Sequence, residues 1–408
     1  MKPALNYSQL GKFEKFPNRP SPMGYCSNCV YPASSAVPLA FDENGVCSGC
    51  QVADQRDSVD WDRREKLFLR LIDDYRSKDG SNYDCIIPVS GGKDSYYQIH
   101  LLAKEYGLRP LLVTYHANNY SEVGMSNLLN MRDAFGVDHI FFTPSIHVLK
   151  KMNRLGQLIM GDVNWHAHAG INTYPIRTAV QHNISLLFWG EHGYMDVGGQ
   201  HSYDDMVEFT YRQRHEHMLR GYEWYDFVDR GKDFNSEFGD NQLEKQDLVS
   251  WMYPTDEEIE RVDVRGIFIS NYFKWEANEH TQLVKDLYGF QEAAEPFERT
   301  YRTMSNLDDI HENGIHDYMK YIKFGYGRAS DHVCKDIRAG KKTREEGIEI
   351  VRKMDPVKPK DLLRWLEYVG WSEEQWDRVA DQFRDPRVWW IGEDGNWVKD
   401  NIWDSNRR

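Results

Sequence analysis

The chain carries a run of residues suited to phosphate chemistry. Directly after an apolar stretch that ends at Val89 comes Ser90-Gly91-Gly92-Lys93-Asp94-Ser95. Paired glycines let the backbone wrap a phosphate, and the free N–H groups at the start of a following helix point at it. Asp94 can face a magnesium ion, because hard cations prefer carboxylate and phosphate oxygens. The run predicts a nucleotide site, and the alternative is a polar turn between a buried strand and a helix.

This run resembles a known nucleotide loop. A Walker loop is excluded, because it needs a hydroxyl residue after the lysine and this chain has Asp94 there. The pattern is similar to the SGGxDS loop of the ATP pyrophosphatases (PP-loop superfamily), with Lys93 in the variable position. Members of that superfamily split ATP between its α- and β-phosphates and pass AMP to an oxygen atom. The resemblance implies ATP and Mg²⁺ as ligands of the loop.

Four cysteines form two C-x-x-C pairs, Cys26 with Cys29 and Cys47 with Cys50. Tetrahedral zinc takes four thiolates at about 2.3 Å, and each pair lets two sulfurs converge on one ion. We expect a structural Zn²⁺ rather than disulfides, because a cytosolic chain keeps its thiols reduced. An iron–sulfur cluster is the remaining alternative. A closed four-thiolate site has no open position, so we expect this ribbon to scaffold or dock rather than catalyse.

Alternating elements must position these residues. Strand patterns end at Val89 and cover 111–115, 138–143 and 184–190, and helix patterns cover 61–75, 94–106 and 126–135. Such alternation implies an α/β fold, a parallel sheet covered on both faces. Ligands bind beyond the carboxyl ends of the strands in such sheets. We therefore expect the Ser90 loop, the segment 116–119 and the segment 190–192 to share one rim.

The chain divides by pattern into four parts. We expect a zinc ribbon in 1–55, a connecting helix in 56–80, a PP-loop domain in 81–260 and a helical C-terminal region in 261–408 with a substrate segment at 316–345. Beyond about residue 200, long charged and aromatic stretches lack strand alternation, so the second half is predicted to be mostly helical. The tail is predicted to form a packed helical cap around its tryptophans. These are Trp365, Trp371, Trp376, Trp389, Trp390, Trp397 and Trp403.

Composition limits the classes of function. The 408 residues are long enough for two or three domains, and a formal net charge of −14 repels nucleic acid and anionic membranes on average. The start lacks an apolar signal core, and the longest apolar stretch is far short of a membrane span. We expect a cytoplasmic protein with neither nucleic acid nor membrane as partner. Cys85 falls within a strand pattern and is expected to be a buried, inert thiol.

Charge reverses between Lys320 and Arg344, where eight basic residues stand with two acidic ones. We expect an anionic ligand here, although a solvated helix face is the usual fate of a charge run. The same segment contains Phe324-Gly325-Tyr326-Gly327-Arg328. Glycines beside an aromatic ring and a guanidinium suit a ligand loop better than a helix interior.

Together these features resemble one enzyme family. The ribbon, the SGGKDS loop, the strand ending at Glu191 and the block Lys323–Arg328 within 316–332 look like the N-acetyl sugar amidotransferases of bacterial surface-polysaccharide and nonulosonic-acid pathways. The resemblance weakens across 200–260 and in the tail. It implies that the amide oxygen of an acetamido sugar attacks the α-phosphate of ATP, and that ammonia then displaces AMP to leave an acetamidino group. The implied sugar is anionic, either nucleotide-linked or a nonulosonic acid.

The resemblance also implies roles for individual residues. The loop residues Ser90, Gly91, Gly92, Lys93, Asp94 and Ser95 would bind ATP, and Asp94 also Mg²⁺. The catalytic candidates are Asp94, Glu191, Lys323 and Arg328, and the sugar-binding candidates are Tyr326, Arg328, Asp331 and His332. Glu191 would hold magnesium or guide ammonia as a base. The alternatives are an exposed loop carboxylate at Glu191 and an ordinary surface histidine at His332.

The ammonia source is inferred from the cysteines. An N-terminal-nucleophile glutaminase needs a cysteine after the initiator Met, and this chain has Lys2. Neither Cys85 nor Cys334 has a motif typical of a glutaminase. We therefore expect ammonia from a separate glutaminase subunit of the type paired with imidazole-glycerol-phosphate synthase, with a cyclase-like channel subunit as a further candidate partner.

Two rival functions share some of these features. A PP-loop tRNA thiolase also combines such a loop with C-x-x-C ribbons, but it needs a basic RNA face. The net charge of −14 and the absence of a further cysteine pair count against it. A non-catalytic nucleotide-binding adaptor would bind ATP without releasing AMP.

Overall fold

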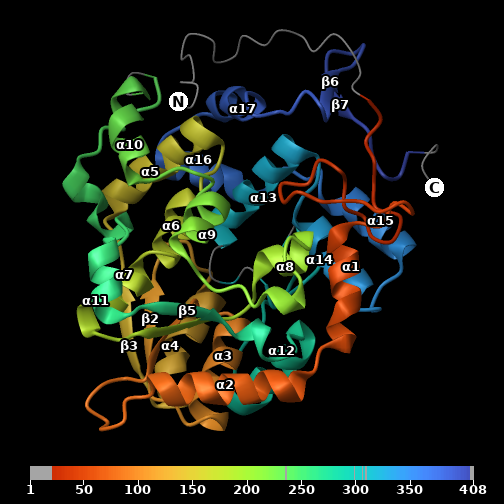
Figure 1. Cartoon of the computed structure of the whole chain (residues 1–408). Helices are drawn as coiled ribbons and strands as arrows, with labels where there is room; N and C mark the ends of the chain where they lie inside the picture. The colour runs from red at the N-terminus through yellow and green to blue at the C-terminus, as the bar shows by residue number, and fades with distance from the viewer. Residues whose placement is uncertain (1–20, 235–236, 298, 306, 308–309, 405–408) are drawn as a thin grey trace.

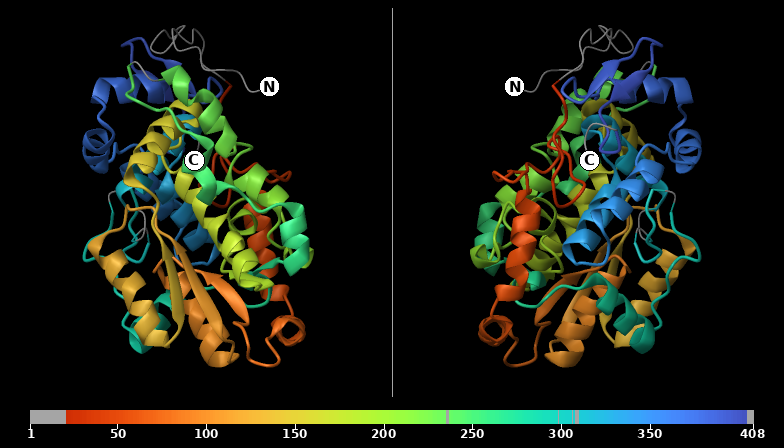
Figure 2. Two further views of the ribbon diagram at one scale, coloured as in Figure 1. Left: turned by 90° about the vertical axis from the view of Figure 1, so that its left-hand side faces the viewer. Right: turned by 90° about the vertical axis from the view of Figure 1, so that its right-hand side faces the viewer.

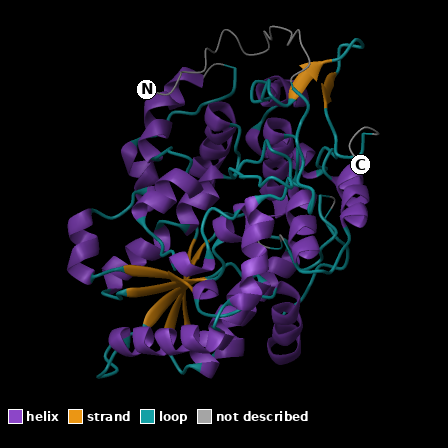
Figure 3. Ribbon diagram, turned by 45° about the vertical axis from the view of Figure 1, so that its right-hand side comes forward, coloured by secondary structure: helices purple, strands orange, loops and turns teal. Residues whose placement is uncertain are grey.

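The structure is a computed structural model that describes residues 21–404 except 235–236, 298, 306 and 308–309. Residues 1–20 of the expected ribbon, including Lys2, lie outside the described residues. A β-sheet occupies one end of the molecule, and helices pack over the rest of it (Figures 1 and 3). Within the described part of the chain, no helix is both long and apolar enough to cross a membrane.

The sheet has five strands in the order β3-β2-β1-β4-β5, and every neighbouring pair is parallel. The strands are β1 (Cys85–Pro88), β2 (Pro110–Tyr115), β3 (Asp138–Phe142), β4 (Leu186–Trp189) and β5 (Arg265–Phe268). The α/β class with a parallel sheet is therefore confirmed. β5 was not expected, because its four residues begin with Arg265-Gly266 and are too short for an alternating pattern. The sheet thus extends past residue 260.

Both faces of the sheet are buried. Successive strand residues point to opposite faces, so Ile86 packs toward α7 (Tyr174–His182) and Ile87 toward the other layer. The other layer consists of α2 (Trp61–Tyr75), α3 (Lys93–Ile99), α4 (Glu122–Phe135) and α12 (Ala277–Tyr288). Figure 2 shows these helices flanking the sheet. Two covered faces explain why the strands are almost continuously apolar.

The predicted helices of this part are largely confirmed. α2 has the predicted bounds, but the helix expected over 94–106 changes at His100 into a π-helical turn that ends at Glu105. α4 begins four residues earlier than expected. The reason is the cap at Ser121, whose side chain accepts a hydrogen bond from the Gly124 N–H.

The second half is mostly helical, as predicted. Further helices that precede residue 200 are α5 (Ile146–Met160), α6 (Trp165–Ile171) and α8 (Gly193–Gly198). The helices after residue 200, besides α12, are α9 (Tyr211–Gln213), α10 (Trp224–Gly231), α11 (Asp256–Val262), α13 (Ile310–Phe324), α14 (Arg328–Arg338), α15 (Arg344–Met354), α16 (Asp361–Val369) and α17 (Glu373–Asp381). α5, α6, α13, α16 and α17 share one hydrophobic core.

The tryptophan-rich tail is only partly the helical cap that was predicted. Trp365 and Trp376 are buried on α16 and α17. The last part is instead an antiparallel hairpin of β6 (Trp389–Ile391) and β7 (Trp397–Lys399). The turn at Asp394-Gly395 explains the difference, because Gly395 has a left-handed φ of +80°.

Candidate functional site

The Ser90–Ser95 loop joins β1 to α3 at the carboxyl end of the central strand. Gly91 has φ +84°, which glycine adopts readily and other residues rarely do. A Cβ atom at this position would also lie 2.9 Å from backbone atoms of Leu128 on α4. The Ser90 N–H donates to Ser95 Oγ at 3.0 Å, which closes the loop on itself. Backbone conformation and crowding therefore both require glycine at position 91.

The loop lies at the switch point of the sheet. The chain runs from β1 outward through β2 to β3 on one side, and from β4 to β5 on the other. Ligands in open α/β sheets bind in the crevice where the strand order reverses. The loop follows β1 and Glu191 follows β4, so both flank this crevice.

Asp94 is the ionised group of the loop. Its Oδ2 lies 2.5 Å from Lys93 Nζ. Burial raises the pKa of Asp94, but the Lys93 ammonium outweighs it and holds that pKa below its usual value. The second oxygen, Oδ1, is buried and has no hydrogen-bond partner among the described residues. An ionised carboxylate with one unpartnered oxygen fits a cation such as Mg²⁺.

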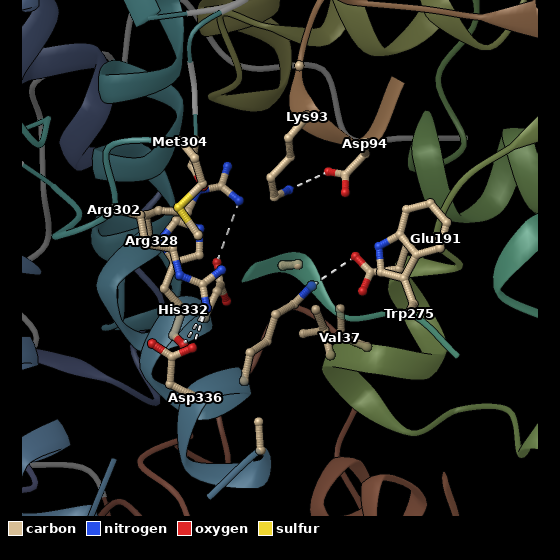
Figure 4. Close-up of a pocket in the computed structure, with 18 of the residues that line it drawn as sticks. Val37, Lys93, Asp94, Glu191, Trp275, Arg302, Met304, Arg328, His332 and Asp336 are labelled. Carbon is tan, nitrogen blue, oxygen red and sulfur yellow. Dashed lines mark hydrogen bonds and ion pairs between the residues drawn. The ribbon is translucent and has the colours of Figure 1, made fainter. Parts of the chain in front are cut away.

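A cavity of about 590 Å³ opens at the switch point, a size typical of small-molecule sites. Lys93 and Asp94 enter it from one side, Glu191 and Trp275 from a second, and Arg302, Arg328 and Asp336 from a third (Figure 4). The Ser90–Ser95 loop and the C-terminal helices therefore line the same cavity. The segment 116–119 is not part of its lining, and Asn118 and Asn119 line a separate cavity of about 90 Å³. Only two of the three segments expected at this rim meet in the cavity.

The four sugar-binding candidates line this cavity. Tyr326, Arg328, Asp331 and His332 all belong to its wall, around the short link between α13 and α14. Gly325 in that link has φ +79°, so the predicted loop between helices is present. Tyr326 Oη accepts from the Ala36 N–H at 3.1 Å. The segment of the predicted ligand loop thus faces the predicted ATP loop across one space.

His332 is not a surface histidine. Its side chain is buried, and its Nδ1 lies 2.6 Å from Thr300 Oγ1. Burial, together with the nearby Arg302 and Arg328, holds the pKa of His332 well below its usual value. His332 is therefore neutral at the wall of the cavity.

Several cations of the basic segment are paired with carboxylates. Lys335 lies 2.9 Å from Glu191 and Arg328 3.0 Å from Asp317, two carboxylates from outside the segment, and Lys320 forms an ion pair with Asp331 inside it. The two outside carboxylates neutralise part of the local excess of positive charge that the sequence shows. Glu191, a predicted catalytic residue, is part of such a pair, and it is partly buried.

Lys323 is not among the residues that line the cavity. It is half-buried near Phe383 and Gly161. Burial lowers the pKa of Lys323 to about 7, with Arg220 as the next cause. Its predicted catalytic role would therefore need a rearrangement that brings the amine into the cavity.

The four C-x-x-C thiols converge in one buried cluster. A tetrahedron of sulfurs around zinc at about 2.3 Å has edges of about 3.8 Å, and Cys29 Sγ lies 3.7 Å from Cys47 Sγ. Arg338 on α14 donates to Cys47 Sγ and Cys50 Sγ at 3.5 Å each. The donor set and its spacing fit Zn²⁺.

The ribbon reaches the cavity through α14. Tyr31 Oη donates to Asp331 at 2.8 Å, and Ala36 and Val37 line the cavity itself. Cys334 on α14 is buried in the same hydrophobic cluster as the four cysteines of the ribbon. Cys85 lies apart in the sheet core, where burial raises the pKa of its thiol, as expected of an inert cysteine.

A second group of residues lies at the cavity, and sequence reasoning gave none of them an individual role. His168, Arg220 and His316 line the cavity, and Asp162 lies behind His316. Of these residues, His316 alone falls in the predicted substrate segment 316–345. They come from α6, from the segment before α10 and from α13. No spacing in the sequence links positions this far apart, and segment 200–260 carried no recognisable motif.

Comparisons with known proteins agree with part of this assignment. The family described as "LPS biosynthesis protein WbpG-like, C-terminal domain" matches residues 294–402. This range contains Arg302, Arg328 and Asp336 of the cavity wall. An uncharacterized protein of Methanocaldococcus jannaschii is 26% identical over 113 residues, which are 28% of this chain and 40% of that protein. The chain thus spans less than half the length of that relative.

A solved structure aligns over a larger share of the chain, but at a lower sequence identity. NMN synthetase from Francisella tularensis matches 58% of this chain and 99% of its own, at 13% identity and a TM-score of 0.28.

Proposed function

We propose that this protein is an ATP-dependent amidotransferase that converts an acetamido group of an anionic sugar to an acetamidino group, in the biosynthesis of a bacterial surface polysaccharide. The observation that carries this proposal is that the Ser90–Ser95 loop and the α13–α14 link line one shared cavity. One wall has the residue types of an AMP-transferring loop. The other belongs to the range that matches a lipopolysaccharide-biosynthesis family.

The chemistry begins at the amide oxygen, which is a poor leaving group. It attacks the α-phosphate of ATP, pyrophosphate departs, and ammonia then adds to the carbon and displaces AMP. The loop amides and hydroxyls bind the phosphates and hold them in line with the amide oxygen. Asp94 would hold Mg²⁺, which supplies positive charge against the phosphates. Lys93 and Arg328 stabilise the charge that develops during transfer.

The α13–α14 link is the proposed sugar wall. Tyr326 and Arg328 are held by contacts to the ribbon and to Asp317, so they present fixed donors to the sugar. Asp331 and His332 complete this wall beside Arg328. Zn²⁺ in the cysteine cluster would fix α14 through Arg338 and leave the chemistry to the cavity.

A separate glutaminase subunit is the proposed source of ammonia. Ammonium salt should replace that subunit in vitro. Purified protein that hydrolyses glutamine alone, at the rate of sugar turnover, would contradict this part of the proposal.

The proposal is tested by ATP turnover. With Mg²⁺, ammonium and an acidic acetamido sugar, the protein should release AMP and pyrophosphate. Asp94→Asn removes the carboxylate charge while keeping its shape, and it should lower this rate about 100-fold or more. Asp133→Asn, at an exposed position on α4, is the matched control and should keep the rate. Thiolated tRNA formed from ATP, sulfur and RNA would instead support the thiolase reading.

A further inference from the structure

The cavity has a second polar end that the proposed ATP loop does not explain. His316 Nδ1 lies 2.7 Å from the buried Asp162 carboxylate, and His168 lies beside His316 with ring centroids 5.1 Å apart. Burial raises the pKa of Asp162, but His316, His168 and Arg220 outweigh burial and hold that pKa well below its usual value. Asp162 is therefore ionised and accepts the hydrogen bond from Nδ1 of His316. That bond fixes the imidazole and leaves Nε2 for the cavity that His316 lines.

Arg220 stands at this end with a strained backbone. Its φ is +55°, a left-handed conformation that is a genuine outlier for a bulky residue. Strained backbone of this kind is found most often at functional sites. Arg220 lines the cavity as an exposed residue, and its guanidinium forms no hydrogen bond or ion pair with the residues that the structure describes.

The charges of the cavity separate its two ends. The positive charge of Lys93 lowers the pKa values of Asp94, His280 and His332. The positive charge of Arg220 instead lowers the pKa values of Asp162, His168 and Lys323. Arg328 lines the same cavity, and its positive charge lowers the pKa of both His168 and His332. A ligand in the cavity can therefore contact the ATP loop at one end and Arg220 at the other.

Arg220 also supplies the charge that the cavity does not balance. The other lysines and arginines of the described wall each face a carboxylate, in the pairs Arg56–Glu276, Lys93–Asp94, Arg302–Asp336, Lys320–Asp331, Arg328–Asp317, Lys335–Glu191 and Lys341–Glu276. Arg220 has no such partner. The ligand that completes this wall is therefore an anion at the Arg220 end.

A metal ion is the competing occupant. Ligand atoms of Asp162, His168 and His316 lie within 4.8 Å of one another, which is a donor set for a divalent cation. Arg220 and Arg328 both lower the pKa of His168, however, and the same positive charges oppose the binding of a cation there. One carboxylate among these cations favours an anion instead.

We infer that Arg220, together with the His316 imidazole that Asp162 orients, binds the carboxylate of an acidic acetamido sugar and so selects it over the neutral sugar. A guanidinium and a carboxylate form a bidentate, charge-assisted pair of defined geometry. This inference rests on the proposed function, because it names the part of the substrate that the second end recognises. It assigns a role to the segment 200–260, in which no motif was recognised.

Equilibrium binding tests the inference without turnover. The probes are N-acetylglucosaminuronic acid and N-acetylglucosamine, which differ in the carboxylate, and N-acetylneuraminic acid with its methyl ester. The intact protein should bind the acid of at least one pair more tightly than its neutral counterpart. Because charged hydrogen bonds contribute about 1.5–3 kcal/mol, Arg220→Asn should weaken the acid about 10- to 100-fold and leave the neutral sugar unchanged.

The variants separate loss of the guanidinium from loss of the fold. Asparagine tolerates the left-handed backbone, so Arg220→Asn should keep its melting temperature. Arg220→Gly should melt at a higher temperature than the wild type while losing the acid preference, because it relieves the strain. Arg212→Gln, at an exposed position in the same segment, is the control and should behave as the wild type.

Three results would overturn the inference. The first is the absence of any acid preference in the wild-type protein for either pair. The second is an acid preference that survives in Arg220→Asn. The third is a second equivalent of bound metal, beyond the cysteine cluster, that His316→Ala removes. None of these results depends on ATP turnover, so a failure here is distinguishable from a failure of the proposed reaction.

Discussion

At the scale of single residues, Gly91 is the position that backbone geometry restricts most clearly. Alanine at Gly91 meets two penalties, a left-handed φ and a Cβ 2.9 Å from Leu128. Alanine at Gly107, with φ +63° and nothing within 4 Å, meets only the first. We expect Gly107→Ala to cost about 1–2 kcal/mol of unfolding free energy, and Gly91→Ala to cost more and to abolish ATP binding. Chemical denaturation and nucleotide titration measure both, and equal costs would contradict the crowding at Leu128.

Lys323 gives a prediction with a defined pH dependence. Its pKa is about 7 in the folded protein and about 10.4 in an unfolded chain. The unfolded state therefore binds more protons between these values, and the destabilisation that Lys323 causes is full below pH 7 and fades as pH rises to about 10.4. Lys323→Met should raise the melting temperature more at pH 6.5 than at pH 10. An equal gain at both pH values would show that the amine is not buried in this way.

Residue types alone indicated the loop and the cysteine set. They could not indicate which charged side chains form ion pairs, because the partners in these pairs are distant in sequence. The basic segment looked like a site for an anion, yet Lys335 and Arg328 are matched by Glu191 and Asp317. Arg220, which has no such match, lies in a stretch without any motif.

At the scale of elements, α14 connects the cysteine ribbon to the cavity. Arg338 at its end contacts two cysteine sulfurs, and Asp331 near its start accepts a hydrogen bond from Tyr31 of the ribbon. The ribbon thus holds the helix that presents His332 to the cavity. Loss of the cluster should disturb the site even though no cysteine of the cluster lines it.

The cluster is tested by removing one ligand. Cys47→Ser should lower bound zinc from one equivalent and speed hydrogen exchange in α1 (Ser48–Gln55) and α14, because structural zinc sites contribute folding energy directly. Helix α5, in a different hydrophobic core, should exchange as before. Cys85→Ser, the control for a buried thiol outside the cluster, should retain its zinc. Full zinc content in Cys47→Ser would argue against four-thiolate coordination.

The elements themselves followed from the sequence where patterns were long. Apolar spacing predicted α2 and the first four strands of the sheet, since each buries a regular face. β5 was missed because it is four residues long and pairs only through the tertiary fold. The β6–β7 hairpin was missed because its tryptophans suit a helical cap equally well, and only the left-handed Gly395 marks the turn.

At the scale of the whole molecule, the cavity is assembled from parts that are distant in the chain. The loop after β1, Glu191 after β4, two residues of the ribbon and the α13–α14 link all meet in it. The rule for parallel sheets predicted that the first two would meet. It could not predict that the ribbon and the C-terminal helices would close the same space, because their packing depends on contacts among helices rather than on strand order.

The central claim is that this cavity transfers AMP to an acetamido oxygen and that ammonia then replaces it. The most direct measurement is mass spectrometry of acidic acetamido sugars incubated with the protein, ATP, Mg²⁺ and isotopically labelled ammonium. The account predicts a sugar in which one oxygen is replaced by one labelled NH group, formed in step with AMP and absent with Asp94→Asn. AMP release without any change in the sugars, or no AMP with any sugar of the panel, would contradict it.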